Sequence, residues 1–584
     1  MADALTQVVD RTADFPPHPG SPKMPRWEGG ELPETPVFHW KSLSTFLGPG
    51  VVMAAAAIGG GEWLTGPLVT ARYGGALLWL ATLSIIGQVI YNIEISRYTL
   101  YTGEPIFTGK FRTLPGPMFW LLVYLVLDCG SLLPYLASHA AIPAAALYLG
   151  RLPDSVTDSR FLTILSCVIF VSVLLPLTVG GKVYNSLKML MSLKLVVVMG
   201  FLVFLAVFYS KPDTWTEIGT GFVQFGSFPV ISDEDTNGNG KRDEGEMPLK
   251  PKVENIMATW SSGRLFPRLD LSMIGILVSM IAISGNGGLS NTPISNFTRE
   301  QGWGMGKHVG AIPSIVGGHA IELSHVGMVF RVSRESLERW SRWVHHVQRE
   351  QIYLWMPACF LGLALPSMLS VQFLPRGLEL KDRYQAAAMT ADGVGEAVGG
   401  SLVTTRDDEG EIVSQKRPLL NQLFWSSTLF CGFLVLATSM ITTADGVLRR
   451  WVDVCWTALP SLQKWDTKHI GKLYFGVLCV YALLGLVMLC FVKGDVLLIF
   501  SGMIYNYALG FSSWHVVLVN SVLLPQELRP SWRRRIALAC FGTFFLTAAA
   551  VSTWVEVPKL MAEINKPKQS VTQVPAVNAD RAGK

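Results

Sequence analysis

Residues 46–64 read FLGPGVVMAAAAIGGGEWL, and residues 271–289 read LSMIGILVSMIAISGNGGL. Each stretch opens with an apolar run of about 13 residues, which then stops at a cluster of glycines. A helix of that length rises only about 20 Å, whereas the hydrocarbon core of a bilayer is about 30 Å thick. Each run therefore needs its continuation. Non-helical backbone is left near the middle of a membrane, where it is tolerated only if it is buried in protein or lines a cavity.

Two interrupted helices in corresponding positions are the best sequence indication of the substrate site of an inverted-repeat transporter. Composition supports a membrane protein independently. The 584 residues are 50% hydrophobic and 16% charged, with a mean hydropathy of +0.36, whereas soluble domains carry about 25% charged residues. No basic run interleaved with aromatic residues indicates a nucleic-acid partner. The eight cysteines lack the spacing of a zinc site and are typical of small membrane-helix residues rather than of a disulfide framework.

The apolar segments predict about eleven membrane spans. They are 46–72, 75–97, 118–149, 161–179, 187–209, 271–298, 352–373, 421–442, 471–492, 494–523 and 535–555. Lys and Arg gather in alternate short loops, and the positive-inside rule places those loops in the cytoplasm. We therefore expect a multi-pass protein of the plasma (inner) membrane, with a cytoplasmic N-terminus and an outside C-terminus.

Polar stretches divide the chain further. Residues 1–40 are rich in proline and predict a disordered cytoplasmic tail. The transmembrane domain is expected over 45–555, with outside insertions at 210–268 and 374–418, a cytoplasmic loop at 299–351 and an outside tail at 556–584.

The cytoplasmic loop contains an amphipathic segment at residues 333–351. Trp340, Trp343 and Val347 share one helical face, with charged residues such as Arg342 nearby. This pattern predicts a helix that lies in the inner membrane interface. The alternative is a loop helix whose apolar face packs on protein.

Three motifs resemble the Nramp family of divalent-metal transporters. Gly48-Pro49-Gly50 opens the first span as that family's first helix does, and residues 95–103 (ISRYTLYTG) look like its Arg-Leu-Gly-x-x-Thr-Gly ending. Residues 181–188 (GKVYNSLK), leading to Lys211-Pro212, are similar to its fourth-to-fifth connection. The resemblance covers about residues 45–555. It implies an all-α integral membrane fold of the LeuT-like type, with two inverted five-helix repeats, two broken helices and one extra helix.

The chain departs from that family at both breaks. The family carries Asp-Pro-Gly-Asn at the first break, and its Asp and Asn bind metal, whereas this chain has Gly59 at the Asp position and Glu62 at the Asn position. At the second break the family has Met-Pro-His, and this chain has Gly285-Asn286-Gly287. No arginine lies within the ninth predicted span. The resemblance implies a transporter, without the family's usual metal selectivity or proton coupling.

Glu62 is the one acidic residue beside the first break. An ionised carboxylate in a membrane segment needs a cation, a partner or water. We prefer the interpretation that Glu62 binds a transported cation. The alternatives are a cap on the second half-helix through its backbone N–H groups, and a gate that titrates with protons.

Neutral oxygens surround this carboxylate in the predicted site. Ser284 and Asn286 stand at the second break, Gly59 offers its backbone carbonyl, and Asn506 on the tenth span is expected to face the cavity. Such an oxygen-only site suits Mg²⁺, Ca²⁺ or Mn²⁺ better than a thioether site would. The alternative is that both glycine clusters only permit close helix packing.

Two further polar residues share the third span. Asp128 and His139 lie near one face of the span, about 16 Å apart along an ideal helix. One interpretation is a proton or ion relay. The other is a set of packing hydrogen bonds to neighbouring spans.

The first outside insertion contains a calcium-loop pattern, D-x-[DN]-x-[DN]-G-x₅-E. Its expected ligands are Asp235, Asn237, Asn239, the Lys241 carbonyl, Asp243 and Glu246. The alternative is an acidic, solvated loop without calcium.

The leading hypothesis is a secondary transporter of a divalent cation, Mg²⁺ or Mn²⁺, that works by alternating access. The alternatives are a transporter of a small organic solute and a membrane sensor that does not transport. No nucleophile–base set or phosphate loop predicts an enzyme. The expected partners are the transported ion or solute and membrane lipid, and no cofactor is expected besides Ca²⁺ at the outside loop.

Overall fold

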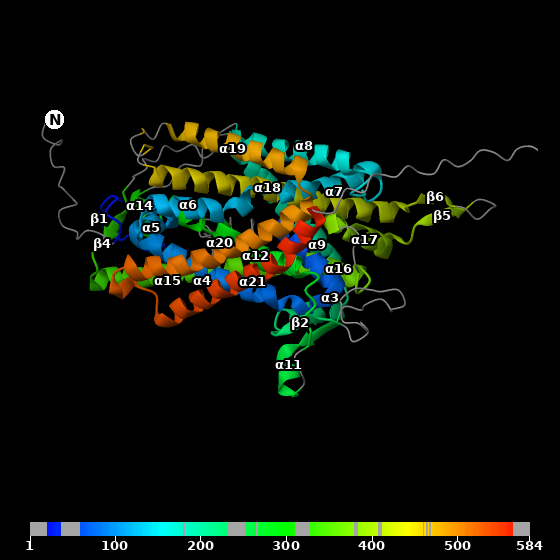
Figure 1. Cartoon of the computed structure of the whole chain (residues 1–584), viewed down its shortest axis with the longest axis horizontal. Coiled ribbons are helices and arrows are strands. Elements are labelled where there is room, and N and C mark those ends of the chain that lie inside the picture. The colour runs from blue at the N-terminus through cyan, green and yellow to red at the C-terminus, as the bar shows by residue number, and fades with distance from the viewer. Residues whose placement is uncertain are drawn as a thin grey trace, which may run out of the picture.

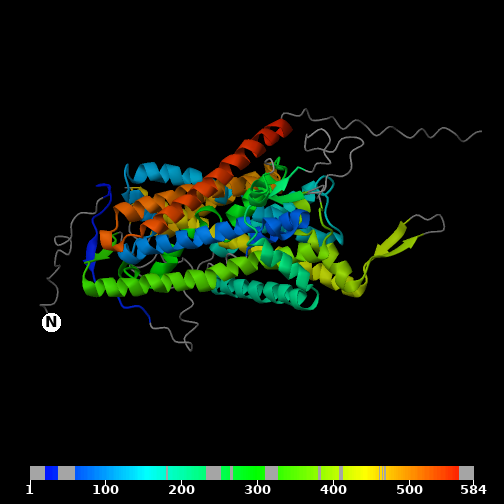
Figure 2. The ribbon, with the colours of Figure 1, turned by 90° about the horizontal axis from the view of Figure 1, so that it is seen from below.

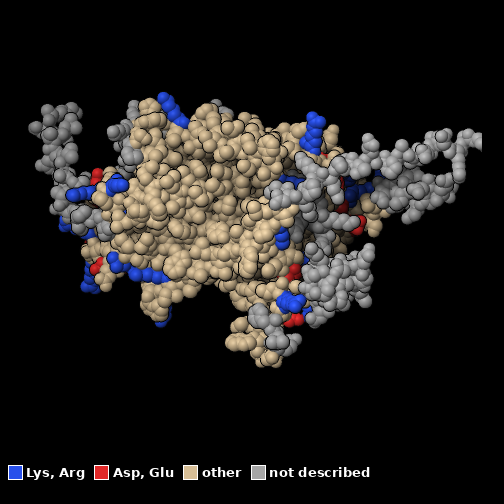
Figure 3. Space-filling view, viewed as in Figure 1, with Lys and Arg blue, Asp and Glu red and all other residues tan. Residues whose placement is uncertain are grey.

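The computed structural model describes residues 20–36, 59–178, 182–231, 252–263, 267–309, 326–378, 383–406, 412–459, 461–462, 465 and 469–564. Long helices run side by side along the long axis of the molecule (Figure 1). Among the described residues, eight helices are long and apolar enough to cross a membrane, or up to ten if each of two sharply bent helix pairs is one span. On the face in Figure 3, charged side chains are sparse over the middle and lie toward the two ends. The chain is therefore a multi-pass membrane protein.

The predicted first break is confirmed on its C-terminal side, from Gly59 onward. Helix α3 (Gly60–Tyr73) begins there, and the preceding Gly59 is extended, with φ −117° and ψ −175°. Residues 46–58, the expected first half of this span, lie outside the described residues. After the 3₁₀ turn η2 (Gly74–Leu77), the chain bends by 94° into α4 (Trp79–Thr102).

The second predicted break is also confirmed. Helix α12 (Ile274–Ile283) ends at Ser284, and the chain resumes as the 3₁₀ turn η4 (Gly288–Asn291) and helix α13 (Ile294–Glu300). Gly285 has φ +107°, a conformation that L side chains rarely adopt. A Cβ there would also stand 3.1 Å from the Trp355 ring, so this position requires glycine.

The predicted third span, 118–149, is not one continuous helix. It consists of α6 (Pro117–Leu127), the 3₁₀ turn η3 (Cys129–Leu132) and α7 (Tyr135–Leu149). Pro134 directly precedes α7 and has no N–H group to continue a helical ladder. Asp128 therefore stands at a break rather than inside a helix.

The remaining helices follow the predicted order of spans. They are α5 (Ile106–Arg112), α8 (Ser159–Thr178), α9 (Lys182–Phe208), α14 (Gly306–Val309), α16 (Met356–Phe373), α18 (Leu419–Ala458), α19 (Ile470–Phe491), α20 (Gly494–Val522) and α21 (Trp532–Ile564). Helix α18 is longer than its predicted span of 421–442, because the helix continues through Arg449 and Arg450 to Ala458.

Both predicted outside insertions contain regular structure, the first below the bundle and the second at its right end in Figure 1. The first has α10 (Pro212–Gly221), the antiparallel strands β2 (Ser227–Val230) and β3 (Lys252–Asn255), and α11 (Ile256–Ser261). The second has α17 (Thr390–Gly399) and the antiparallel strands β5 (Val403–Arg406) and β6 (Ile412–Lys416). An ion pair of 2.7 Å between Glu217 and Arg376 joins the two insertions. The calcium-loop residues Asp235 to Glu246 lie outside the described residues, so this motif stays a prediction.

Part of the N-terminal region is ordered, which differs from the expected disorder over residues 1–40. Residues 20–36, here called the N-terminal strap, include the strand β1 (Glu28–Gly30), which pairs in parallel with β4 (Met328–Phe330). Trp27 and Leu32 are buried, and the Trp27 ring lies edge-on to Tyr101 at 5.9 Å between centroids. These apolar residues give the strap a surface that packs on the bundle.

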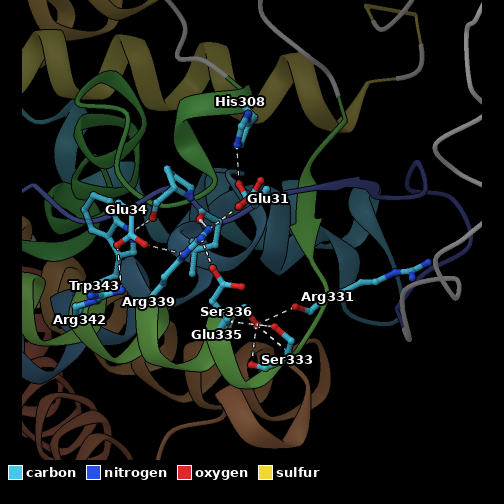
Figure 4. Close-up of polar contacts among 12 residues, drawn as sticks. Glu31, Glu34, His308, Arg331, Ser333, Glu335, Ser336, Arg339, Arg342 and Trp343 are labelled. Atoms are coloured by element: carbon cyan, nitrogen blue, oxygen red, sulfur yellow. Dashed lines mark hydrogen bonds and ion pairs between the residues drawn. The ribbon is translucent and has the colours of Figure 1, made fainter.

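The strap also holds the predicted amphipathic helix, α15 (Arg334–Glu350). Trp343 is buried, and its indole N–H donates to the Pro33 carbonyl at 2.8 Å. Arg339 contacts the carboxylates of Glu31 and Glu34 at 2.7 Å and 2.9 Å (Figure 4).

Helix α15 does not lie as a separate element in the membrane interface. It continues through a π-helical turn, η5 (Gln351–Trp355), into α16, and the three form one long rod (Figure 2). Its apolar face is buried on protein, which is the alternative that the sequence left open.

Candidate functional site

A cavity of about 160 Å³ lies where the two breaks meet, which is room for several water molecules. Five elements contribute walls: the start of α3, the second break with α13, α7, α18 and α20. The polar part of its lining includes Glu62, Asn286, Ser290, Ser439, Asp445 and Arg449, and Gly59 lies beside them.

Glu62 links the two breaks. Its side chain is 2% exposed, and its Oε2 accepts a hydrogen bond from the Gly59 N–H at 3.2 Å. Its Oε1 accepts from the Gly285 N–H at 3.1 Å. The contact with Gly59 is the capping interaction that the sequence offered as an alternative. A carboxylate has about four lone-pair directions, so these two bonds leave acceptor capacity toward the cavity.

Two N–H groups at the first break have partners within the chain. Besides the Gly59 N–H, the Gly60 N–H donates to Ser439 Oγ on α18 at 3.0 Å. Open N–H groups at a helix start attract anions. Because a carboxylate and a hydroxyl occupy these two groups, neither of them is open to a further anion.

Gln88 of α4 fixes the second break. Its side-chain oxygen accepts from the Asn286 N–H at 3.0 Å and from the Asn291 amide at 2.9 Å. Its side-chain nitrogen donates to the Ser284 carbonyl at 2.9 Å and to Ser84 Oγ at 3.0 Å. The sequence analysis missed this residue, because Gln88 lies far from the second break in the sequence and no local motif links the two.

Three of the predicted site residues meet at the cavity, namely Gly59, Glu62 and Asn286. Ser284 is not among the described residues that line it, and its hydroxyl donates to the Met280 carbonyl at 2.6 Å. Asn506 is also not among them. It is buried, and its amide donates to the Val278 carbonyl at 2.8 Å, joining α20 to α12.

Asp128 forms a buried ion pair with Arg450 of α18. Asp128 Oδ2 accepts from Arg450 Nε at 2.9 Å, and Oδ1 accepts from Nη2 at 2.8 Å. The indole N–H of Trp451 donates to the same carboxylate at 2.6 Å. His139 instead has its Nδ1 at 2.8 Å from the Tyr135 carbonyl of its own helix. These contacts favour the packing interpretation of Asp128 and His139 over a relay. Arg450 lies beyond the predicted span of 421–442, so the sequence analysis missed this pair.

A different charged pair, Asp445 and Arg449 of α18, does line the cavity. Arg449 contacts Asp445 at 2.9 Å on its own helix and Glu300 of α13 at 3.4 Å. Both Asp445 and Arg449 lie nearer than Ser439 to the C-terminal end of α18. The cavity therefore extends from the breaks along α18 toward that end.

No cluster of three or more His, Cys, Asp or Glu side chains that could hold a metal ion occurs in the described part of the chain. The cavity lining there contains no His, Cys or Met side chain. A cation at this position would thus depend on Glu62 together with amide, hydroxyl and backbone oxygens.

The fold can be compared with known proteins. No family model and no curated protein matches the sequence. Crystal structures of two variants of the manganese transporter of Eremococcus coleocola match with a TM-score of 0.53. One is 12% identical over 92% of this chain and 91% of that chain, and the other is 11% identical over 92% of each. The chain has the fold of that transporter. The expected fold class, an all-α membrane protein of the LeuT-like type with two broken helices, is thereby confirmed.

Proposed function

We propose that this chain is a secondary transporter that moves a divalent cation of the Mg²⁺ or Mn²⁺ type by alternating access. The observation that carries the proposal is Glu62, a buried carboxylate on the cavity wall that accepts N–H groups from both broken helices. A cation bound there would contact both breaks at once, so its binding and release could be coupled to their movement. The structural neighbours named above are manganese transporters, which agrees with this proposal.

The chemistry of the lining supports a hard cation. Carboxylate, amide and hydroxyl oxygens are the ligands that Mg²⁺ and Mn²⁺ prefer. Glu62, Asn286 and Ser290 supply these three types. The Gly59 and Gly60 N–H groups are occupied by the chain's own oxygens, which disfavours an anionic solute.

We further propose that the chain lies in the plasma membrane with its N-terminus in the cytoplasm, as the loop charges predict. The C-terminal end of α18 would then be cytoplasmic. The cavity, which extends toward Asp445 and Arg449, would correspond to the inward-facing state of the cycle.

The test is uptake of Mn²⁺ and of Mg²⁺ into proteoliposomes. The wild type is compared with Glu62→Gln, which keeps the shape of the side chain and removes its charge, and with Glu527→Gln, an exposed residue, as a control. We expect saturable uptake by the wild type and the control, and a loss of at least about tenfold in Glu62→Gln, equivalent to about 1.4 kcal/mol. Equal uptake by wild type and Glu62→Gln would contradict the proposal.

One observation favours a second candidate, a small organic solute. Tyr135, Leu136, Ile283 and Tyr505 give the cavity apolar and aromatic walls, which are typical of organic ligand sites. Folded protein that takes up neither ion, yet transports an organic solute, would establish that alternative. Ligand binding without any flux would indicate a sensor.

A further inference from the structure

Lys194 of α9 is a buried cation close to the first break. The residue is 2% exposed, and its Nζ donates to Ser439 Oγ at the long distance of 3.4 Å. An ammonium has three N–H donors. Among the described residues, Ser439 is its one hydrogen-bond partner. A buried ammonium with so little hydrogen bonding is costly unless a charge compensates it.

Lys194 stands behind the cavity wall rather than on it. Ser439, which does line the cavity, accepts both the Lys194 ammonium and the Gly60 N–H. The Ser439 hydroxyl therefore bridges the ammonium and the start of α3. The acidic residue in the first turn of this helix is Glu62, whose Oε2 accepts the N–H of the neighbouring Gly59.

We propose that Lys194 is the internal counter-charge of Glu62 in the empty carrier, an inference that rests on the cation transport proposed above. A carrier that moves an ion in one direction must return empty. An uncompensated carboxylate at the middle of a membrane would make that return costly. The tethered ammonium supplies the missing positive charge, and an arriving divalent cation then takes over as the main partner of Glu62.

This arrangement also weakens cation binding. Lys194 repels a divalent ion at Glu62, and because ion and ammonium are both buried, the repulsion is larger than in water. A transport site must bind strongly enough to load and weakly enough to release. Loss of the Lys194 charge should therefore affect net uptake more than exchange of bound ions. Loss of a packing residue should affect both equally.

The experiment uses the full chain, with Mn²⁺ as the probe, and measures three quantities for each variant. They are Mn²⁺ affinity by calorimetry, net uptake into liposomes without Mn²⁺, and exchange in liposomes loaded with unlabelled Mn²⁺. The neutral variants are Lys194→Gln and Lys194→Met. Lys194→Arg retains the charge, and Lys493→Gln changes an exposed lysine as a control.

We expect both neutral variants to bind Mn²⁺ at least about tenfold more tightly and to lose net uptake by a similar factor. Exchange should fall less than net uptake, because bound ions enter and leave without the empty return step and only their slower release affects it. Lys194→Arg should restore net uptake.

Unchanged affinity in the neutral variants, an equal loss of exchange and net uptake, or failure of both neutral variants to fold would overturn the role of Lys194. Each of these results would assign the residue to packing. A wild type that neither binds nor transports Mn²⁺ would overturn the proposed cation transport itself, and with it this inference. The two failures are thus distinguishable.

Discussion

Gln88 holds the backbone of the second break through its side-chain amide. If Gln88 is changed to Leu, the Asn286 N–H and the Ser284 carbonyl lose the partner that the structure gives them. A buried polar group without a hydrogen bond costs about 1–3 kcal/mol, so we expect Gln88→Leu to lower stability by about 2–6 kcal/mol. Thermal unfolding of the purified protein in detergent measures this. Gln526→Leu, at an exposed position of the 3₁₀ turn η8 (Gln526–Leu528), is the control. Equal melting temperatures for the two variants would contradict the role of Gln88.

Individual site residues differ in how far the sequence could identify them. Gly59, Glu62 and Asn286 could be predicted because they lie next to an interruption in an apolar run, where the backbone is expected to line a cavity. Gln88 and Lys194 could not, because they lie on other helices and meet the breaks only through packing. Arg450 pairs with Asp128 across 322 residues of sequence, and no local pattern encodes a pairing at that separation.

At the scale of elements, α15 illustrates what amphipathic periodicity does and does not specify. The pattern of Trp340, Trp343 and Val347 correctly predicts a helix with one apolar face. It does not specify what covers that face, since a membrane surface and a protein surface are equally apolar. The cover is partly the N-terminal strap, whose proline content predicted disorder although Trp27 and Leu32 are buried.

Arg339 is expected to fasten the strap to α15. Its side chain is only 16% exposed and contacts Glu31, Glu34 and Glu335. A network of this kind is worth more than an isolated surface pair. We expect Arg339→Ala to speed proteolytic cleavage within residues 20–36 by about fivefold, the effect of about 1 kcal/mol. Mass spectrometry of timed digests measures the rate. Arg334→Ala is the control because the Arg334 side chain is 97% exposed, and similar rates in both variants would refute the role of Arg339.

The same contact gives the strap a dependence on pH. A hydrogen bond from Arg339 and, secondarily, its charge lower the pKa of Glu31. A carboxyl group whose pKa is lowered in the folded state stabilises that state above its ordinary pKa, and the contribution is lost as the pH falls through the lowered value. Cleavage of the wild-type strap should therefore quicken only under acidic conditions, and less so in Arg339→Ala.

At the scale of the whole molecule, the predicted order of spans, the second break and the start of α3 agree with the described part of the structure. Hydropathy and glycine interruptions can be read locally in the sequence, and a membrane strongly restricts the backbone that crosses it. The break in the predicted third span and the length of α18 were missed. The Asp128–Arg450 pair joins the two places, with the arginine inside α18 and the carboxylate at the end of α6.

The direction in which the cavity faces can be tested together with the orientation of the chain. Thr443 of α18 lines the cavity on the side of Asp445 and Arg449, and Ser261 is exposed in the first insertion. If the N-terminus is cytoplasmic, a membrane-impermeant thiol reagent should label Thr443→Cys in inside-out vesicles and Ser261→Cys in right-side-out vesicles. Mass spectrometry at the introduced residue separates this labelling from that of the native cysteines. Mn²⁺ should slow labelling of Thr443→Cys alone, because only that residue shares the cavity with Glu62. Labelling of Thr443→Cys chiefly from the outside would mean that the cavity opens to the opposite face, and the assignment of an inward-facing state would then be wrong.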